Sequence, residues 1–241
     1  MLYASYGRGF TSNFGPLWQW DPLQYIRDTR PSKLDSFEIG VKGTAADNLI
    51  TYQLALYYLK QNDRAVNIPN PAAATDFTAP LNIATSGQEY SSKGLEASIE
   101  VRPVASTLIA LSYAHTDATW DKFELTGTGE FTGNKPRGIA PHTIWASLQH
   151  SFTDAIQGEV TYEWYDDYYV TLDNTVKNGS YGLFGANISY ATEWLGGVSL
   201  NLSATNLLNN EYYFYHGGTT VARLAVPGVP RQVRLSVRKN F

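Results

Sequence analysis

The sequence has no cysteine, so disulfide bonds and thiolate metal sites are excluded. It also has no run of about 18 consecutive apolar residues, which a membrane-spanning helix would need. The net charge of −4 over 241 residues argues against general nucleic-acid binding, which depends on excess positive charge. These absences still leave room for a β-rich membrane protein. Barrel strands contribute only alternate residues to the lipid face, so their average hydropathy stays low.

Catalytic and metal-binding motifs are lacking as well. None of the four histidines, His115, His142, His150 and His216, has a partner at the spacing of a motif such as H-E-x-x-H. The sequence contains no G-x-S-x-G nucleophile turn and no phosphate-binding loop. We therefore expect no enzyme, no cofactor and no metal site.

A two-residue repeat of apolar and polar side chains is present instead, and it is clearest in Val229–Phe241. Because side chains alternate across a strand, this segment has one apolar face and one polar, cationic face. A soluble sandwich would bury the apolar face, whereas a membrane barrel turns it to lipid and lines an aqueous lumen with the other. The terminal Phe241 favours the barrel, since an aromatic there can sit in the interfacial girdle and serve as a barrel-assembly signal.

The same repeat recurs in about ten segments, each near the ~9–11 residues that a tilted strand needs to cross a bilayer. The expected strands are Leu2–Phe10, Leu34–Gly43, Ile50–Leu59, Ser91–Arg102, Thr107–Ala118, Pro141–Ser151, Ile156–Val170, Tyr181–Ala191, Gly197–Asn206 and Val229–Phe241.

The connections between these segments alternate in length. Pro103–Ser106 is a tight turn, whereas Gln61–Gln88 and Leu207–Gly228 are expected to be long loops. Outer-membrane barrels have tight turns on the periplasmic face and long loops outside. The sequence therefore predicts an all-β, antiparallel, up-and-down transmembrane β-barrel. His115 and His150 then fall on lipid-facing positions near strand ends.

Six segments in order carry a resemblance to a known family. They are L-Y-A-S-Y-G-R-G-F at Leu2–Phe10, F-E-I-G-V-K-G at Phe37–Gly43, K-G-L-E-A-S at Lys93–Ser98, L-S-Y-A-H-T-D-A at Leu111–Ala118, N-L-L-N-N-E-Y-Y at Asn206–Tyr213, and the terminal strand. Together they make residues 1–241 resemble the C-terminal β-barrel part of a TonB-dependent outer-membrane receptor. The resemblance implies a place in the bacterial outer membrane and about ten strands of a larger barrel of about 22 strands.

The sequence departs from the family at a few points. Lys239 stands where the family commonly has an aromatic, and Asn209 replaces the usual aspartate. The N-terminal plug domain of the family and roughly the first half of its barrel have no counterpart. We therefore expect the chain to be a fragment of a complete transporter.

The implied function is TonB-energised uptake of a scarce, bulky nutrient, with a ferric siderophore as the expected ligand. The implied partners are outer-membrane lipid, that ligand, the TonB complex through the missing plug, and the barrel-assembly machinery. Aromatic side chains in the apical loops can stack on a metal chelate, although loop packing or lipopolysaccharide contact would explain them equally well. The candidate residues are Trp18, Trp20, Tyr25, Arg27, Tyr165, Tyr213, Tyr215 and His216.

An alternative is a self-contained small outer-membrane barrel that acts as a passive pore or a rim protease. Ten-stranded outer-membrane proteases carry acidic pairs at the extracellular rim, and Asp166 and Asp167 occupy a comparable place at the top of a strand. A solvated, aromatic and acidic rim is the simpler interpretation, because no histidine partner is evident. A third hypothesis, a soluble β-rich sugar-binding protein, predicts solubility without detergent.

Overall fold

The computed structural model describes residues 1–12, 30–69, 74–75, 82–125, 129–192, 197–216 and 224–239. No helix in these ranges is long and apolar enough to cross a membrane. The described residues form sixteen β-strands: β1 Leu2–Thr11, β2 Ser32–Ala45, β3 Ile50–Pro69, β4 Asn82–Val104, β5 Thr107–Lys122, β6 Glu124–Leu125, β7 Gly129–Glu130, β8 His142–Ser151, β9 Ile156–Tyr165, β10 Tyr168–Tyr169, β11 Lys177–Asn178, β12 Tyr181–Thr192, β13 Val198–Thr205, β14 Tyr213–His216, β15 Leu224–Pro227 and β16 Gln232–Lys239.

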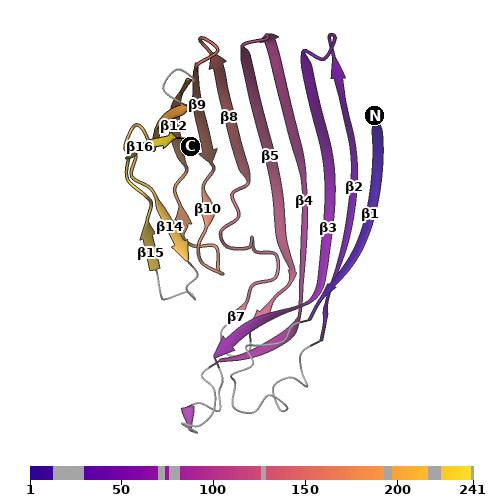
Figure 1. The fold of residues 1–241 in the computed structure, drawn as a ribbon. Helices are drawn as coiled ribbons and strands as arrows, with labels where there is room; N and C mark the ends of the chain where they lie inside the picture. Colours follow the sequence, from indigo (N-terminus) through magenta and orange to yellow (C-terminus); the bar gives the residue numbers. More distant parts are fainter. Residues whose placement is uncertain are drawn as a thin grey trace.

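Ten of these strands form one antiparallel sheet in the order β1-β2-β3-β4-β5-β8-β9-β12-β13-β16. Figure 1 shows the sheet as a curved wall, with short turns at the upper end of the view and longer connections at the lower end. The remaining strands form the pairs β6-β7, β10-β11 and β14-β15 near the end with the longer connections. The predicted up-and-down order and the number of wall strands are confirmed.

The predicted boundary between wall and loop is wrong for the third and fourth strands. Gln61–Gln88 is not a loop throughout, because β3 continues to Pro69 and β4 begins at Asn82. The two strands stay paired beyond the apolar repeat, with register shifts on either side of Arg64. Hairpin hydrogen bonds and side-chain contacts, such as the Arg64 guanidinium group over the Trp120 ring, hold this extension without an alternation of apolar side chains.

Two further segments differ from the prediction. Ile156–Val170 is not one strand: β9 ends at Tyr165, and Tyr168–Tyr169 pairs instead with Lys177–Asn178. Leu207–Gly228 is not only a loop, since β14 and β15 form a hairpin within it. Short hairpins at the extracellular end therefore occupy parts of the expected loops.

The strand register gives the wall two different faces. Leu56 lies opposite both Ile39 and Leu95, whereas Gln53 lies opposite Ser98 on the other face. The apolar face is uncovered by other described residues. Its large side chains remain exposed: Ile39 and Leu56 by 51%, Val233 and Leu235 by 66%, and Val237 by 65%. A single exposed apolar layer is what a lipid-facing barrel wall requires.

The buried hydrophobic cluster lies beyond the wall, at the end with the longer connections. It consists of Trp120, Phe123, Leu125, Phe131 and Leu172, each at most 6% exposed. The cluster joins the end of β5, the β6–β7 hairpin and the segment that follows β10. It packs these connections into a small core of their own.

Tyrosine rings lie flat over glycines of neighbouring strands on the polar face. Tyr57 of β3 lies opposite Gly94 of β4, and Tyr3 of β1 lies opposite Gly40 of β2. A Cβ at Gly94 would come 2.6 Å from the Tyr57 hydroxyl oxygen and would also collide with the His115 carbonyl oxygen. The absence of a side chain therefore lets the ring cover the sheet at this point.

We expect Gly94→Ala to destabilise the barrel by about 1–3 kcal/mol, because the new methyl group overpacks the wall. Gly179→Ala is the control, since a Cβ at Gly179 meets no atom within 4 Å. The measurement is the urea midpoint of the intact outer-membrane protein in detergent, followed by the heat-modifiable mobility of the folded barrel. Equal midpoints for the two variants would contradict the packing argument.

Candidate functional site

Four aromatic rings form a continuous stack at the extracellular end of the wall, which we call the tyrosine ladder. Tyr165 stacks on Tyr181 with ring centroids 5.1 Å apart, and Tyr181 stacks on Tyr212 at 4.8 Å. Phe214 meets Tyr212 edge-on at 5.3 Å. The register pairs Tyr165 with Tyr181, so the ladder begins on β9 and β12 and continues to β14. It presents a broad aromatic surface with phenolic hydroxyl groups.

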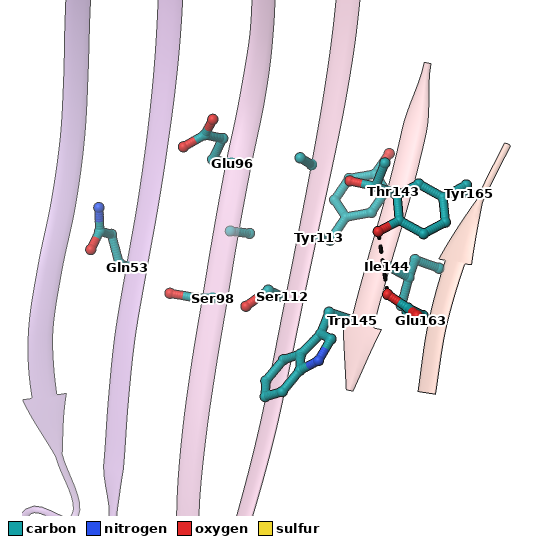
Figure 2. A pocket seen from close by; sticks show the side chains of 12 residues that line it. Gln53, Glu96, Ser98, Ser112, Tyr113, Thr143, Ile144, Trp145, Glu163 and Tyr165 are labelled. Carbon is teal, nitrogen blue, oxygen red and sulfur yellow. Dashed lines mark hydrogen bonds between the residues drawn. The ribbon is translucent and has the colours of Figure 1, made fainter. Parts of the chain in front are cut away.

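The ladder borders a hollow of about 320 Å³ on the polar face of the wall. Figure 2 shows the side chains that line it, which come from adjacent strands of the sheet. Tyr165 donates a hydrogen bond from its hydroxyl to Glu163 Oε2 at 3.3 Å. The other polar side chains on this face are Gln53, Glu96, Ser98, Ser112 and Thr143, together with the indole of Trp145. The described part of the lining therefore contains two carboxylates and no cation.

One asparagine holds the two apical hairpins together beside the ladder. Asn178 is 5% exposed, and its amide nitrogen donates to the Tyr168 hydroxyl at 2.9 Å and to the Tyr213 carbonyl at 2.7 Å. The adjacent Lys177 forms an ion pair with Asp167 at 2.9 Å, and this hydrogen bond raises the pKa of the Lys177 ammonium group. These contacts link β10–β11 to β14.

A second asparagine shapes the turn that leads from β13 to the ladder. Asn206 has a φ of 48°, a left-handed conformation that asparagine tolerates better than most residues. Its amide nitrogen donates to the carbonyls of Asn210 at 2.9 Å and Val229 at 3.1 Å, and its Oδ1 accepts from the Asn210 amide at 2.8 Å. The turn fixes the start of the segment that carries Tyr212.

The structure brings together only part of the predicted site. Tyr165 lies in the ladder, and Tyr213 lies beside it with 43% of its surface exposed. The backbones of Tyr215 and His216 belong to β14. The other predicted residues, Trp18, Trp20, Tyr25, Arg27 and Phe241, lie outside the described residues.

The sequence interpretation missed Tyr181, Tyr212 and Phe214. The signal for Tyr181 is the hairpin register, since it pairs with Tyr165 across adjacent strands. Tyr212 and Phe214 flank Tyr213 in a segment that was predicted to be a loop, so no strand alternation was expected to mark them. No local motif marks any of the three.

The acidic pair and the histidines do not form a catalytic arrangement in the described part of the chain. Asp167 is paired with Lys177, and the Asp166 side chain accepts the Asp167 amide hydrogen at 2.8 Å. His142 stacks on His115, with centroids 4.6 Å apart, on the apolar, outward face. The described ranges hold no group of three or more His, Cys, Asp or Glu residues arranged to bind a metal.

A curved single-layer wall with an exposed apolar face and a polar inner face defines part of an outer-membrane β-barrel. The family described as TonB dependent receptor-like, beta-barrel matches residues 1–207. The chain therefore belongs to this family of outer-membrane receptors.

Two characterised relatives are similar to the chain. The ferrichrome outer membrane transporter/phage receptor of Escherichia coli strain K12 is 27% identical over 190 residues, which cover 76% of the chain and 23% of that protein. The ferric-pyoverdine BN7/BN8 receptor of Pseudomonas putida is 24% identical over 240 residues, which cover 100% of the chain and 26% of that protein. The chain thus spans about a quarter of the length of these relatives.

Solved structures agree with the fold. The siderophore receptor PiuA from Acinetobacter baumannii superposes with a TM-score of 0.75 at 17% identity, covering 98% of the chain and 33% of the receptor. The ferric yersiniabactin uptake receptor FyuA from Yersinia pestis gives a TM-score of 0.74 at 15% identity, covering 100% and 35%. The chain corresponds to a portion of such a barrel.

We expect Asn206→Ala to destabilise the extracellular end by about 1–3 kcal/mol, because the carbonyls of Asn210 and Val229 lose a side-chain donor and the positive φ becomes strained. Hydrogen exchange should rise in β14 and β15 and stay unchanged in β2 and β3. Asn209→Ala is the control variant, because Asn209 is exposed and also has a positive φ. Its side chain accepts one hydrogen bond, from the Arg231 amide at 2.9 Å. An Asn206→Ala protein with native protection in β14 would contradict the assignment.

Proposed function

We propose that this chain forms part of the wall and extracellular end of a receptor that takes up a ferric siderophore across the outer membrane with energy from TonB. The family assignment carries the proposal, and the names of the relatives, a ferrichrome transporter and a ferric-pyoverdine receptor, support the ligand class. Uptake would require the longer protein, including a plug domain that contacts TonB. Insertion would depend on the barrel-assembly machinery.

The tyrosine ladder and the wall hollow are the surfaces proposed to meet the ligand. Aromatic rings stack on flat, polarisable groups, and hydroxyl and amide groups can hydrogen-bond the oxygen atoms of a chelate. Glu96 and Glu163 place negative charge in the hollow, and no described residue of its lining supplies a compensating cation. This charge favours a neutral or cationic chelate, such as a ferric hydroxamate, over a strongly anionic one.

The proposal assigns no covalent chemistry to the chain. The iron belongs to the transported ligand, and the residues of the site bind and orient that ligand. Asp167 is paired with Lys177, which argues against a proteolytic role for the acidic pair. The competing function is a passive pore, in which the wall would conduct small solutes without energy.

Deletion of the gene that encodes the receptor should abolish uptake of radiolabelled ferric hydroxamate by iron-starved cells, and the intact gene should restore it. A protonophore should stop the restored uptake, because energy transfer through TonB depends on the proton-motive force. Uptake that continues with the protonophore would favour the passive pore. The control is a small sugar taken up through general porins, whose outer-membrane passage the protonophore should not change.

The double variant Tyr165→Leu and Tyr181→Leu should weaken ferric hydroxamate binding about tenfold, since each aromatic contact contributes roughly 0.5–1.5 kcal/mol. The matched variant Tyr165→Phe and Tyr181→Phe keeps both rings and should bind within about twofold of the native protein. Intrinsic fluorescence quenching of the purified receptor measures both affinities. A tenfold loss in the phenylalanine variant as well would assign the effect to the hydroxyl groups and refute stacking.

A further inference from the structure

Two histidine rings stack on the outward face of the wall, at the extracellular end of the β5–β8 pairing. His115 lies directly opposite His142, and their ring centroids are 4.6 Å apart with 29° between the ring planes. His142 is the first residue of β8, and its carbonyl accepts a hydrogen bond from the Asp166 amide at 3.0 Å. The pair therefore lies where the wall ends and the extracellular connections begin.

The two rings differ in their hydrogen-bond partners. The Nδ1 atom of His142 is 2.8 Å from the Tyr113 hydroxyl oxygen. A neutral imidazole can accept the hydroxyl hydrogen there, and an imidazolium can donate to the hydroxyl oxygen, so this bond is possible in both charge states. The Nδ1 atom of His115 is buried and has no hydrogen-bond partner among the described residues. The stacked position therefore suits His115 only while its ring is neutral.

Protonation of both rings is unfavourable in the stack. Histidine is the side chain whose charge ordinarily changes between about pH 8 and pH 5. Two imidazolium rings in contact repel each other. The Nδ1–H group of a charged His115 would also be a buried donor without an acceptor. Because His142 keeps its bond to Tyr113 in either state, His115 is the ring that must leave the stack when the second proton binds.

A hollow of about 310 Å³ beside His115, which we call the outer hollow, offers the charged ring a second position. It lies between β5, the connection that precedes β8 and the β10–β11 hairpin, and its lining includes the carboxylates of Asp117 and Asp167. A charged ring in the outer hollow would meet these two carboxylates. The charged and titratable side chains around His115 are Lys93 on β4, Tyr113 and Asp117 on β5, His142 on β8, Lys135 on the connection, and Asp166, Asp167, Tyr168, Tyr169 and Lys177 on or beside the hairpin.

The same carboxylates hold the extracellular connections against the wall. Asp117 pairs with Lys135 of the connection, whose ammonium group also donates to the Thr119 hydroxyl at 3.2 Å. Asp167 pairs with Lys177 of β11 at 2.9 Å. A positive ring in the outer hollow would compete with both lysines for their carboxylates. Movement of the ring would therefore loosen the connection and the hairpin together.

We propose that His115 is a pH-sensitive switch. Acidification moves its ring out of the stack on His142 and into the outer hollow, and this releases residues 134–141 and the β10–β11 hairpin from the end of the wall. Because Asn178 of the hairpin donates a hydrogen bond to the Tyr213 carbonyl, the release also reaches the segment that carries the tyrosine ladder. The proposal rests on the barrel fold and does not depend on the transported ligand.

The test follows amide hydrogen exchange of the intact outer-membrane protein in a non-ionic detergent at about pH 8 and about pH 5.5, which bracket the charge change of histidine. Protection factors correct each amide for the pH dependence of its intrinsic exchange rate. In the native protein, the protection of residues 134–141 and 168–178 should fall about tenfold at the lower pH, because local opening involves only these segments. The protection of β2 and β3 should not change.

Three single variants separate the switch from a general effect of acid. His115→Phe keeps a ring in the stack but cannot be protonated, so the fall in protection should disappear. His115→Lys carries its charge at both pH values and should show the low protection already at about pH 8. His150→Phe is the matched control, because His150 is an outward histidine near the opposite end of β8. It should keep the full response.

Several outcomes would overturn the proposal. They are an undiminished response in His115→Phe, an equal loss of response in His150→Phe, and native protection of His115→Lys at the higher pH. Heat-modifiable mobility checks assembly of every variant. If His115→Phe does not assemble, His142→Phe removes the second charge and should reduce the fall in protection. An undiminished fall in His142→Phe would then refute the switch.

Discussion

The structure depends on one constraint. A single layer of strands must hydrogen-bond all of its own backbone N–H and C=O groups, while hydrocarbon contacts one face and water contacts the other. An unsatisfied N–H or C=O group in lipid costs several kcal/mol, so every wall strand within the sheet pairs with both neighbours. Pairing fixes the register, and the register fixes which side chains meet lipid. A wall of this kind has no interior in which to bury large side chains. Close packing is achieved within the layer instead, as where the Tyr57 ring lies over Gly94.

Outside the membrane the same chain follows the ordinary rules of a soluble domain. Water again favours burial of apolar surface, and the connections respond by packing Trp120 and Phe123 into a small core. Polar ties such as those of Asn178 and Asn206 then hold the hairpins in place. The tyrosine ladder lies at the boundary between the membrane-spanning wall and the packed extracellular connections. Its first rings are positioned by wall register and its last by the packed connections.

This division explains what the sequence could predict. Lipid on one face and water on the other require apolar residues such as Leu95 and Ile99 to alternate with polar residues such as Glu96. This alternation is visible in the sequence, and it predicts the ten wall strands. The continuation of β3 to Pro69 carries no such pattern, because pairing with β4 and contacts such as that of Arg64 with Trp120 hold it instead. The site was predictable to the same degree. Tyr165 stands at the end of a patterned strand, whereas its stacking on Tyr181 depends on a register that no local motif records.

The period of two also lets one strand serve two surroundings at once. On β4, Lys93 points outward and Glu96 points into the lumen, although only three residues separate them. The outward position adds positive charge to the outer face of the wall, and the inward position adds negative charge to the wall hollow. Because the sheet backbone and low-dielectric lipid separate the two faces, a change of charge on one face leaves the contacts of the other in place. The charge of each face can therefore change independently along the same strand.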